Sequence, residues 1–378
     1  MRTKVLFVIE NLMGGGAERV FVNLLNNVDK CLFEPVLVVV NSGNGANKYN
    51  PPEGVQLINL QTRKTRALFP LMRVIRHERP DIVFSNLAPI NVLCLMAKLL
   101  LRDFRTKYIA RETTIKSISI KETKANPLVR LVYGQLVRFF YPFADCIVAL
   151  SNGSKDDLVT NFGIDGEKIV VIHNPIDVKE VIHKSMEMIE DADAWKRHFN
   201  VICVGSLVKS KGHIYLLEAM NELVNKRGYD IKLRLIGTGP LRKELGEVAK
   251  RYHLEKHVEF LGFQTNPFKY MRNGDVFVLP ALWEGFGNVI VEAMACGIPV
   301  ISTLCESGPR EIIEHSKTGI LVEPKNVSQI VEAIQLIKDN DNLADQLRSN
   351  ALHRATDFDV SLITRQYEKH FLDTLSRV

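Results

Sequence analysis

Two acidic residues, Glu284 and Glu292, stand eight positions apart in the otherwise apolar stretch ALWEGFGNVIVEAMACGIPVIS, residues 281–302. A carboxylate pair could act as an acid and a base, bind a metal, or accept hydrogen bonds from a ligand. The glycines after Glu284 predict a loop, and the apolar residues that follow predict a helix. Glu284 should therefore lie on the loop, and Glu292 about one turn inside the helix.

The start of this predicted helix gives a reason for the two carboxylates. The N–H groups of Asn288 and Val289 have no partner within a helix, so they attract an anion such as phosphate. Two glutamates are too few ligands for a metal, and we expect none here. A ligand with a phosphate in its middle and hydroxyl groups at both ends would use all three features. That description fits a sugar nucleotide, with its sugar, diphosphate and ribose.

Two further loops carry glycines at predicted strand-to-helix turns. NLMGGGAER, residues 11–19, places three glycines before a helix, where the backbone can approach an anion closely. It is neither a GxGxxG sequence nor a P-loop, so the alternatives are an anion contact and a tight turn. LIGTGPLRKEL, residues 235–245, lacks the third glycine of a dinucleotide fingerprint, and we interpret it as a turn.

A third loop, CVGSLVKSKGH at 203–213, contributes two lysines. Lys209 and Lys211 follow a predicted strand, at the edge of the sheet where α/β proteins bind their ligands. A lysine on a loop is commonly just solvated. The alternative for Lys211, next to a glycine at the end of a strand, is a phosphate ligand.

The segment 102–143 is basic and aromatic. It has nine Lys and Arg residues against three acids, and PLVRLVYGQLVRFFYPF at 127–143 predicts an apolar helix with two arginines. One interpretation is a core helix with solvated charges. The alternative is a surface for anionic lipid or a lipid-linked diphosphate. A nucleic-acid surface is less favoured, because no nucleic-acid-binding motif accompanies the charges.

The distribution of charge and the lengths of the apolar runs limit which partners and which location we expect for the protein. Residues 1–175 carry a net charge of +8 and the remainder −2, so the first half favours an anionic partner. The N-terminal apolar run ends at Glu10, too early for a signal peptide, and no apolar stretch reaches the length of a membrane span. The six cysteines contain no CxxC pair. We therefore expect a protein made and kept in the cytosol.

Short Val/Ile-rich runs alternate with helix-length segments throughout the chain. The runs do not alternate with polar residues, which is typical of strands buried on both faces of a parallel sheet. This order predicts an α/β fold with two doubly wound, Rossmann-like domains that face a central, ligand-binding cleft. The expected strands are 4–10, 35–40, 55–60, 81–86, 107–111, 145–151, 168–174, 199–205, 232–237, 257–262, 275–280, 298–302 and 319–323.

The domain boundaries follow from one interruption of this pattern. The segment 174–195 is polar, opens with Asn-Pro and lacks a strand run. We expect one domain over 1–175, a linker over 176–198 and a second domain over 199–355. A C-terminal helix over 356–378 could pack back on the first domain.

Taken together, these residues resemble glycosyltransferase family 4, retaining enzymes with the two-Rossmann GT-B fold, over nearly the whole chain. EGFGNVIVEAMACGIPVIS is similar to the family's E-x7-E motif, GGGAER to its N-terminal glycine loop, and VGSLVKSKG to its GRLxxxKG segment. EFLGFQTNP at 259–267 is similar to the base-side loop, and SGPREII at 307–313 to the segment after the E-x7-E motif.

The resemblance implies a donor site in the second domain and an acceptor side in the first. Glu284 would accept hydrogen bonds from the donor sugar, and Glu292 from the ribose. The amides of Asn288 and Val289 would hold the β-phosphate, and Lys211 would neutralise the leaving diphosphate in place of a metal.

The remaining donor contacts are implied in the same way. The backbone of Gly285, Phe286 and Gly287 would line the sugar, and the backbone around Phe263 and Gln264 would meet the base. Gly15 and Gly16 would close over the phosphates from the first domain. Gly205, Ser206 and Lys209 would complete the phosphate side of the site.

Two positions depart from the family pattern. Ser206 stands where the family usually has an arginine, which leaves one cation fewer on the diphosphate, and Lys209 could compensate. Thr113, in ARETTIKS, stands where relatives often have a histidine. Both departures concern how phosphate is stabilised and leave the class unchanged.

The activity implied is a metal-independent hexosyltransferase without a cofactor. It would move a hexose or N-acetylhexosamine from a UDP-sugar to a glycan or lipid-linked glycan, in polysaccharide, lipopolysaccharide or glycoprotein-glycan assembly. The enzyme would be cytoplasmic and peripheral at the anionic inner face of the cytoplasmic membrane, with no nucleic-acid partner. A GT-B-fold sugar-nucleotide epimerase and a non-catalytic sugar-nucleotide-binding partner are the alternatives.

Overall fold

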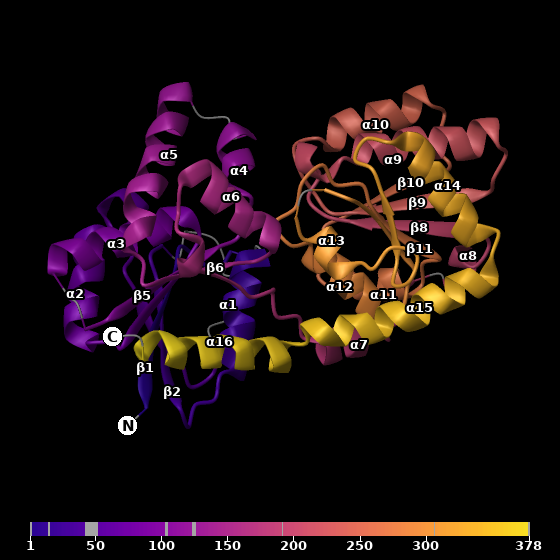
Figure 1. The fold of residues 1–378 in the computed structure, drawn as a ribbon. Coiled ribbons are helices and arrows are strands. Elements are labelled where there is room, and N and C mark those ends of the chain that lie inside the picture. Colours follow the sequence, from indigo (N-terminus) through magenta and orange to yellow (C-terminus); the bar gives the residue numbers. More distant parts are fainter. Residues whose placement is uncertain are drawn as a thin grey trace. The chain divides into compact units, whose positions relative to one another are not determined.

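The computed structural model describes residues 2–13, 16–41, 52–102, 105–122, 126–190, 192–305 and 307–376. The chain divides into two compact units, of which the first is Met1–Pro175 with Val360–Val378 and the second is Ile176–Asp359. Each unit has one parallel sheet with helices on both faces (Figure 1). The predicted α/β fold with two Rossmann-like, doubly wound units is confirmed, and each predicted strand run forms a strand.

The first unit has a seven-stranded sheet in the order β3-β2-β1-β4-β5-β6-β7. The order changes direction between β1 and β4, which makes a switch point at the carboxyl ends of these strands. The strands are β1 Thr3–Ile9, β2 Phe33–Val39, β3 Gln56–Asn59, β4 Ile82–Asn86, β5 Lys107–Glu112, β6 Cys146–Ala149 and β7 Ile169–Val171. The helices are α1 Gly16–Asn27, α2 Leu68–Glu78, α3 Ala88–Leu101, α4 Lys116–Glu122, α5 Pro127–Phe140, α6 Asn152–Phe162 and α16 Val360–Ser376, with 3₁₀ turns η1 Lys64–Arg66, η2 Tyr141–Phe143 and η3 Gly166–Lys168.

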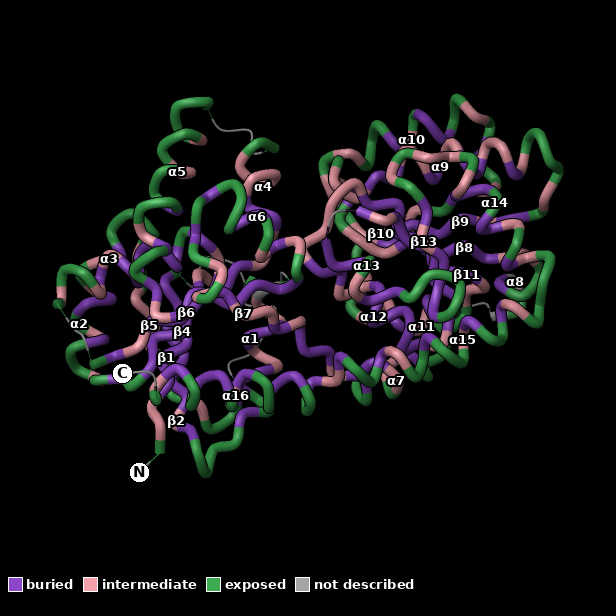
Figure 2. The backbone as a smooth tube through the Cα atoms, in the orientation of Figure 1, coloured by how far each residue is buried: buried purple, intermediate pink, exposed green. Residues whose placement is uncertain are grey.

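The last helix, α16, completes the core of the first unit. Phe371 packs against Phe84 of β4 with 5.2 Å between ring centroids, and Phe84 in turn packs against Phe7 of β1 at 5.4 Å. The hydroxyl of Tyr367 accepts a hydrogen bond of 3.0 Å from Nε of the buried Arg111. Figure 2 shows the strands as the buried centre of the unit. None of the described helices combines the length and the apolar character that crossing a membrane requires.

The second unit has a six-stranded sheet in the order β10-β9-β8-β11-β12-β13, with its switch point between β8 and β11. The strands are β8 Phe199–Val204, β9 Ile231–Ile236, β10 Val258–Gly262, β11 Val276–Leu279, β12 Val300–Thr303 and β13 Ile320–Val322. The helices are α7 Val178–Ser185, α8 Ala192–Trp195, α9 His213–Asn221, the π-helical turn η5 Glu222–Lys226, α10 Arg242–Arg251, α11 Phe268–Arg272, α12 Asn288–Ala295, α13 Pro309–Ile312, α14 Val327–Lys338 and α15 Asp341–Ala355, with 3₁₀ turns η4 Lys209–Lys211 and η6 Thr356–Phe358.

Residues 176–198, where we expected a linker, lie in the second unit. Helix α7 contacts α11 and α12 there, and its Val178 and Val181 are buried. Two short apolar residues in a polar segment give a weak sequence signal, which is why the helix was not anticipated.

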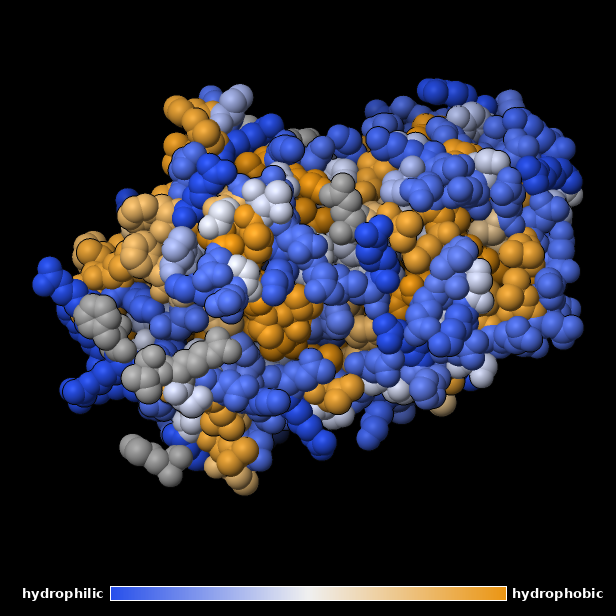
Figure 3. All heavy atoms as spheres, viewed as in Figure 1, coloured by the Kyte–Doolittle hydropathy of each residue, from blue (hydrophilic) through white to orange (hydrophobic). Residues whose placement is uncertain are grey.

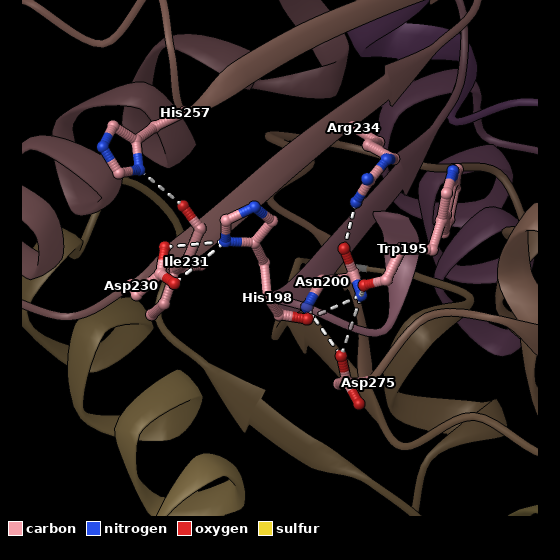
Figure 4. A network of polar contacts seen from close by, with 8 residues as sticks. All are labelled: Trp195, His198, Asn200, Asp230, Ile231, Arg234, His257 and Asp275. Carbon is pink, nitrogen blue, oxygen red and sulfur yellow. Dashed lines mark hydrogen bonds and ion pairs between the residues drawn. The ribbon is translucent and has the colours of Figure 1, made fainter. Parts of the chain in front are cut away.

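A buried arginine links the amino ends of β8 and β9 (Figure 4). The guanidinium of Arg234 donates to the side chain of Asn200 and lies 3.7 Å from the ring of Trp195. Asn200 donates its side-chain N–H to the carbonyl of Trp195 at 2.8 Å, and its backbone N–H to Asp275 at 2.6 Å. Nε of Arg234 also lies 3.2 Å from the carboxylate of Glu259. The network lies toward the strand ends opposite to those where ligands of such sheets bind, so we assign it to folding.

Candidate functional site

Lys211 and Glu284 meet at the switch point of the second sheet. The two residues lie on the loops that follow β8 and β11, and these strands pair in parallel. Nζ of Lys211 contacts Oε1 of Glu284, with 21% and 12% of the two side chains exposed. The structure thus brings together the two residues that the sequence singled out as catalytic candidates, at the sheet edge where ligands are expected.

The two loops pack closely because one of them has a glycine where no side chain would fit. Gly212 has a φ of +64°, and a Cβ there would lie 2.0 Å from the carbonyl oxygen of Pro280. Two residues away on each loop, the N–H of Leu282 donates to the carbonyl of Ser210 at 2.7 Å. These backbone contacts fix the positions from which Lys211 and Glu284 extend.

Gly205 lies against the methylene groups of Lys211, and the glycine-containing turn LIGTGP, residues 235–240, packs against Gly205. A Cβ at Gly205 would touch the methylenes of Lys211 at 3.6 Å. A Cβ at Gly237 would lie 2.0 Å from the carbonyl oxygen of Gly205, and one at Gly239 would lie 2.5 Å from that of Leu207. The glycines of LIGTGP therefore allow two loops to pack backbone against backbone, a reason that the motif alone did not reveal.

Helix α12 begins between the two glutamates. Gly287 caps it with a φ of +100°, and the helix runs from Asn288 to Ala295. Glu292 is buried one turn inside, four residues after Asn288 and therefore on the same face of the helix. The first-turn N–H groups of Asn288 and Val289 make the helix start suitable for an anion.

Ser307 and Gly308 hold the loop between Glu284 and α12, a role that sequence reasoning missed. The hydroxyl of the buried Ser307 donates to the carbonyl of Gly285 at 2.8 Å. A Cβ at Gly308 would lie 1.8 Å from the carbonyl oxygen of Phe286. The motif SGPREII contained the signal, but its residues are polar or small and did not indicate which backbone they would contact.

The side chain of Phe286 is buried, with its ring 5.5 Å from that of Phe358. Its backbone is thus the part that remains to line a ligand, together with Gly285 and Gly287. At the end of β10, Phe263 is exposed, and Gln264 donates to the carbonyl of Leu261 at 2.8 Å.

The remaining predicted residues lie on exposed loops or outside this unit. Ser206 and Lys209 are exposed on the loop after β8. Gly16 is the first residue of α1 in the first unit. Gly15 lies outside the described residues, so its expected phosphate contact remains a prediction.

His213 follows Gly212 and is buried beside Lys211. Burial first, and the charge of Lys211 second, lower the pKa of His213 from 6.5 to about 4. Its Nδ1 has no hydrogen-bond partner among the described residues. The imidazole is therefore neutral near pH 7 and leaves Lys211 as the cation that flanks Gly212.

Thr113, the second departure from the family pattern, follows a buried carboxylate in the first unit. Its N–H donates to Glu112 at 3.0 Å. Glu112 also pairs with Lys116 at 2.9 Å and accepts from the hydroxyl of Tyr141 at 2.7 Å, and burial together with this charge raises the pKa of Tyr141. Within the described residues, no group of three or more His, Cys, Asp or Glu side chains is arranged to hold a metal.

Two family models match the chain. Residues 14–180 match "Glycosyltransferase Family 4", and residues 170–354 match "Glycosyl transferases group 1". The N-acetylgalactosamine-N,N'-diacetylbacillosaminyl-diphospho-undecaprenol 4-alpha-N-acetylgalactosaminyltransferase of Campylobacter jejuni is 31% identical, over 98% of this chain and 99% of that protein. The amylovoran biosynthesis glycosyltransferase AmsD of Erwinia amylovora is 27% identical, over 96% and 98%. An Anabaena protein, HepE, solved with UDP and glucose, has a similar fold, with a TM-score of 0.81 at 22% identity over 98% of this chain and all of that one.

Proposed function

Because the chain belongs to the glycosyltransferase family, in its family 4 type with the GT-B fold, we propose that it is a retaining enzyme for UDP-sugars. It transfers a hexose or N-acetylhexosamine to a lipid-linked glycan. The observation that carries this proposal is the contact of Lys211 with Glu284 beside the start of α12, with Glu292 buried one turn further on.

The sugar, diphosphate, ribose and base of the donor would each bind a different set of these residues. Its sugar hydroxyls bind the carboxylate of Glu284 and the backbone of Gly285, Phe286 and Gly287. Its β-phosphate binds the N–H groups at the start of α12. Its ribose binds Glu292, and its base meets the backbone at Phe263 and Gln264.

Lys211 acts on the charge that develops during transfer. When the bond between the anomeric carbon and the β-phosphate oxygen breaks, its electrons remain on the diphosphate. The Lys211 ammonium and the start of α12 stabilise that charge, which lowers the barrier to transfer without a metal. Gly205, Ser206 and Lys209 contribute to the same side of the site.

The relatives support a lipid-linked acceptor. The names of two Campylobacter transferases, 31% and 25% identical, specify acceptors linked to diphospho-undecaprenol or PP-undecaprenol. The net charge of +8 over residues 1–175 suits a diphosphate and an anionic membrane surface. Gly15 and Gly16 would contact the donor phosphates from this unit. The enzyme would therefore work in the cytoplasm, at the inner face of the membrane.

A panel of nucleotide sugars tests the proposal. Each is scored for protein stabilisation and for nucleotide release with and without a lipid-linked acceptor. A donor at about 100 times its dissociation constant should stabilise the fold by about 2.7 kcal/mol, and release should need the acceptor. Conversion of the donor without an acceptor would instead identify an epimerase, and binding without release under any acceptor would identify a non-catalytic partner.

A further inference from the structure

Helix α5 presents an apolar face to the solvent. Of its described residues, Val137 alone is buried. Leu128, Leu131 and Phe139 are 66%, 60% and 61% exposed, and Val129, Val132 and Leu136 are exposed as well. In Figure 3 hydrophobic atoms cover the projecting end of the helix that Figure 1 labels α5. A soluble protein rarely exposes so continuous an apolar surface unless the surface binds something.

The spacing of these residues reverses the usual arrangement of a surface helix. Leu128, Val132, Leu136 and Phe139 recur at intervals of four, four and three residues, so they form one stripe along the helix. Val137, on the opposite side, faces the body of the unit. A helix that packs only on its own protein would have its apolar stripe inside and polar residues outside, and α5 has the apolar stripe outside.

The charged residues of α5 itself are both positive. Residues 126–143 contain Arg130 and Arg138 and no Asp or Glu. At the end of α5, Phe143 follows in η2, with its ring 5.8 Å from that of Phe139. Phe143 also lines a cavity of about 430 Å³ in the first unit. The charged residues that line this cavity are Lys98, Arg102, Lys107, Lys168 and Asp145.

We propose that the exposed face of α5 docks the enzyme on a bilayer that contains anionic lipids. The apolar stripe enters the boundary between headgroups and acyl chains, as interfacial helices do. The arginines of α5 and the basic cavity beside Phe143 attract the negative headgroups. This inference rests on the proposed function in one respect: a lipid-linked acceptor requires the enzyme to reach the membrane surface.

Vesicle binding tests the proposal. The test variant is Leu128→Gln with Leu131→Gln, because glutamine keeps the helix propensity and removes the apolar surface. The matched control, Leu362→Gln with Leu372→Gln, changes two exposed leucines on α16 of the same unit. Partition of the wild-type protein and of the control is measured by co-sedimentation with phosphatidylcholine vesicles, with and without phosphatidylglycerol.

We expect the wild-type protein and the control to bind vesicles that contain phosphatidylglycerol. The α5 variant should bind about tenfold more weakly or worse. Raising the salt from about 0.1 M to about 1 M shortens the Debye length from about 10 Å to about 3 Å and should weaken binding of the wild-type protein severalfold. Circular dichroism and stabilisation by UDP should be the same in all three proteins, because the donor residues lie in the second unit.

Two results would overturn the docking proposal. One is an α5 variant that binds vesicles as tightly as the wild-type protein. The other is a wild-type protein that ignores vesicles but forms dimers that the α5 variant abolishes, since the face would then join two copies of the chain. Either result would leave donor binding and sugar transfer intact, whereas failure of the proposed function would appear as loss of both while vesicle binding persists.

Discussion

The ammonium group of Lys211 contacts the carboxylate of Glu284, although the two residues are 73 positions apart in the chain. The contact explains how an acidic side chain can stand next to an anion site: its charge is balanced by a cation from the neighbouring loop. A diphosphate bound at the start of α12 would then approach a lysine that already has one carboxylate partner. Both side chains are largely buried, so their interaction is screened less than that of a surface pair.

Lys211→Ala should lower sugar transfer by about 100-fold or more, because a preorganised group facing a developing oxyanion contributes about that much. The rate is measured as UDP release with a saturating acceptor. Lys317→Ala is the control, because it removes a lysine of an exposed pair with Glu314 in the same unit. Equal activity of both variants would exclude Lys211 from stabilising the leaving group.

Glu292→Gln should weaken binding of UDP about tenfold, because hydrogen bonds to a charged acceptor contribute more than those to a neutral one. The loss should disappear for the 2′,3′-dideoxy analogue of UDP, which lacks the hydroxyl groups assigned to Glu292. Calorimetry measures the affinity of each nucleotide for the wild-type protein and for the Glu292→Gln variant. If the analogue showed the same loss as UDP, Glu292 would act on the helix rather than on the ribose.

Ser307→Ala should weaken binding of the UDP-sugar about fivefold, since it removes one buried hydrogen bond, to the carbonyl of Gly285. Binding of UDP alone should change less, because Gly285 faces the sugar part of the donor. Ser328→Ala, which removes an exposed hydroxyl that donates to Glu332, serves as the control. Equal losses for UDP and UDP-sugar would contradict the assignment of this loop to the sugar.

His213 should make the second unit less stable in acid. The unfolded chain binds a proton near pH 6.5, whereas the buried imidazole binds one only near a pKa of about 4. The free energy of unfolding should therefore fall as the pH decreases through this window, by about 2 kcal/mol at about pH 5. Urea unfolding at about pH 7.5 and about pH 5 should show a smaller drop for His213→Gln than for the wild-type protein. The exposed His353→Gln should keep the full drop, and an unchanged drop in His213→Gln would mean that the imidazole titrates normally.

Local patterns predicted the elements well, because strands buried on both faces leave continuous Val/Ile-rich runs such as those of β1 and β11. They also predicted where α12 begins, since the glycines after Glu284 indicated a loop before the apolar run, and Gly287 has a positive φ value at that end of the helix. Helix α7 was not predicted, because its two buried valines lie among polar residues.

Contacts between distant loops could not be predicted in the same way. The pair of Lys211 and Glu284 depends on β8 and β11 being neighbours, which follows from the order of strands in the sheet and from no local spacing. The contact of Gly308 with the carbonyl of Phe286 depends on the path of two loops. The exposure of α5 could not be predicted from the sequence either, because the same apolar stripe is compatible with a helix that faces the core and with one that faces a membrane.

Glu284→Ala is the most direct test of the account, measured as sugar transfer to a lipid-linked acceptor alongside stabilisation by UDP. The account predicts that transfer falls by about 100-fold or more while the protein stays folded and is still stabilised by UDP, whose phosphates and ribose bind other residues. A folded Glu284→Ala protein with full transfer activity would contradict it.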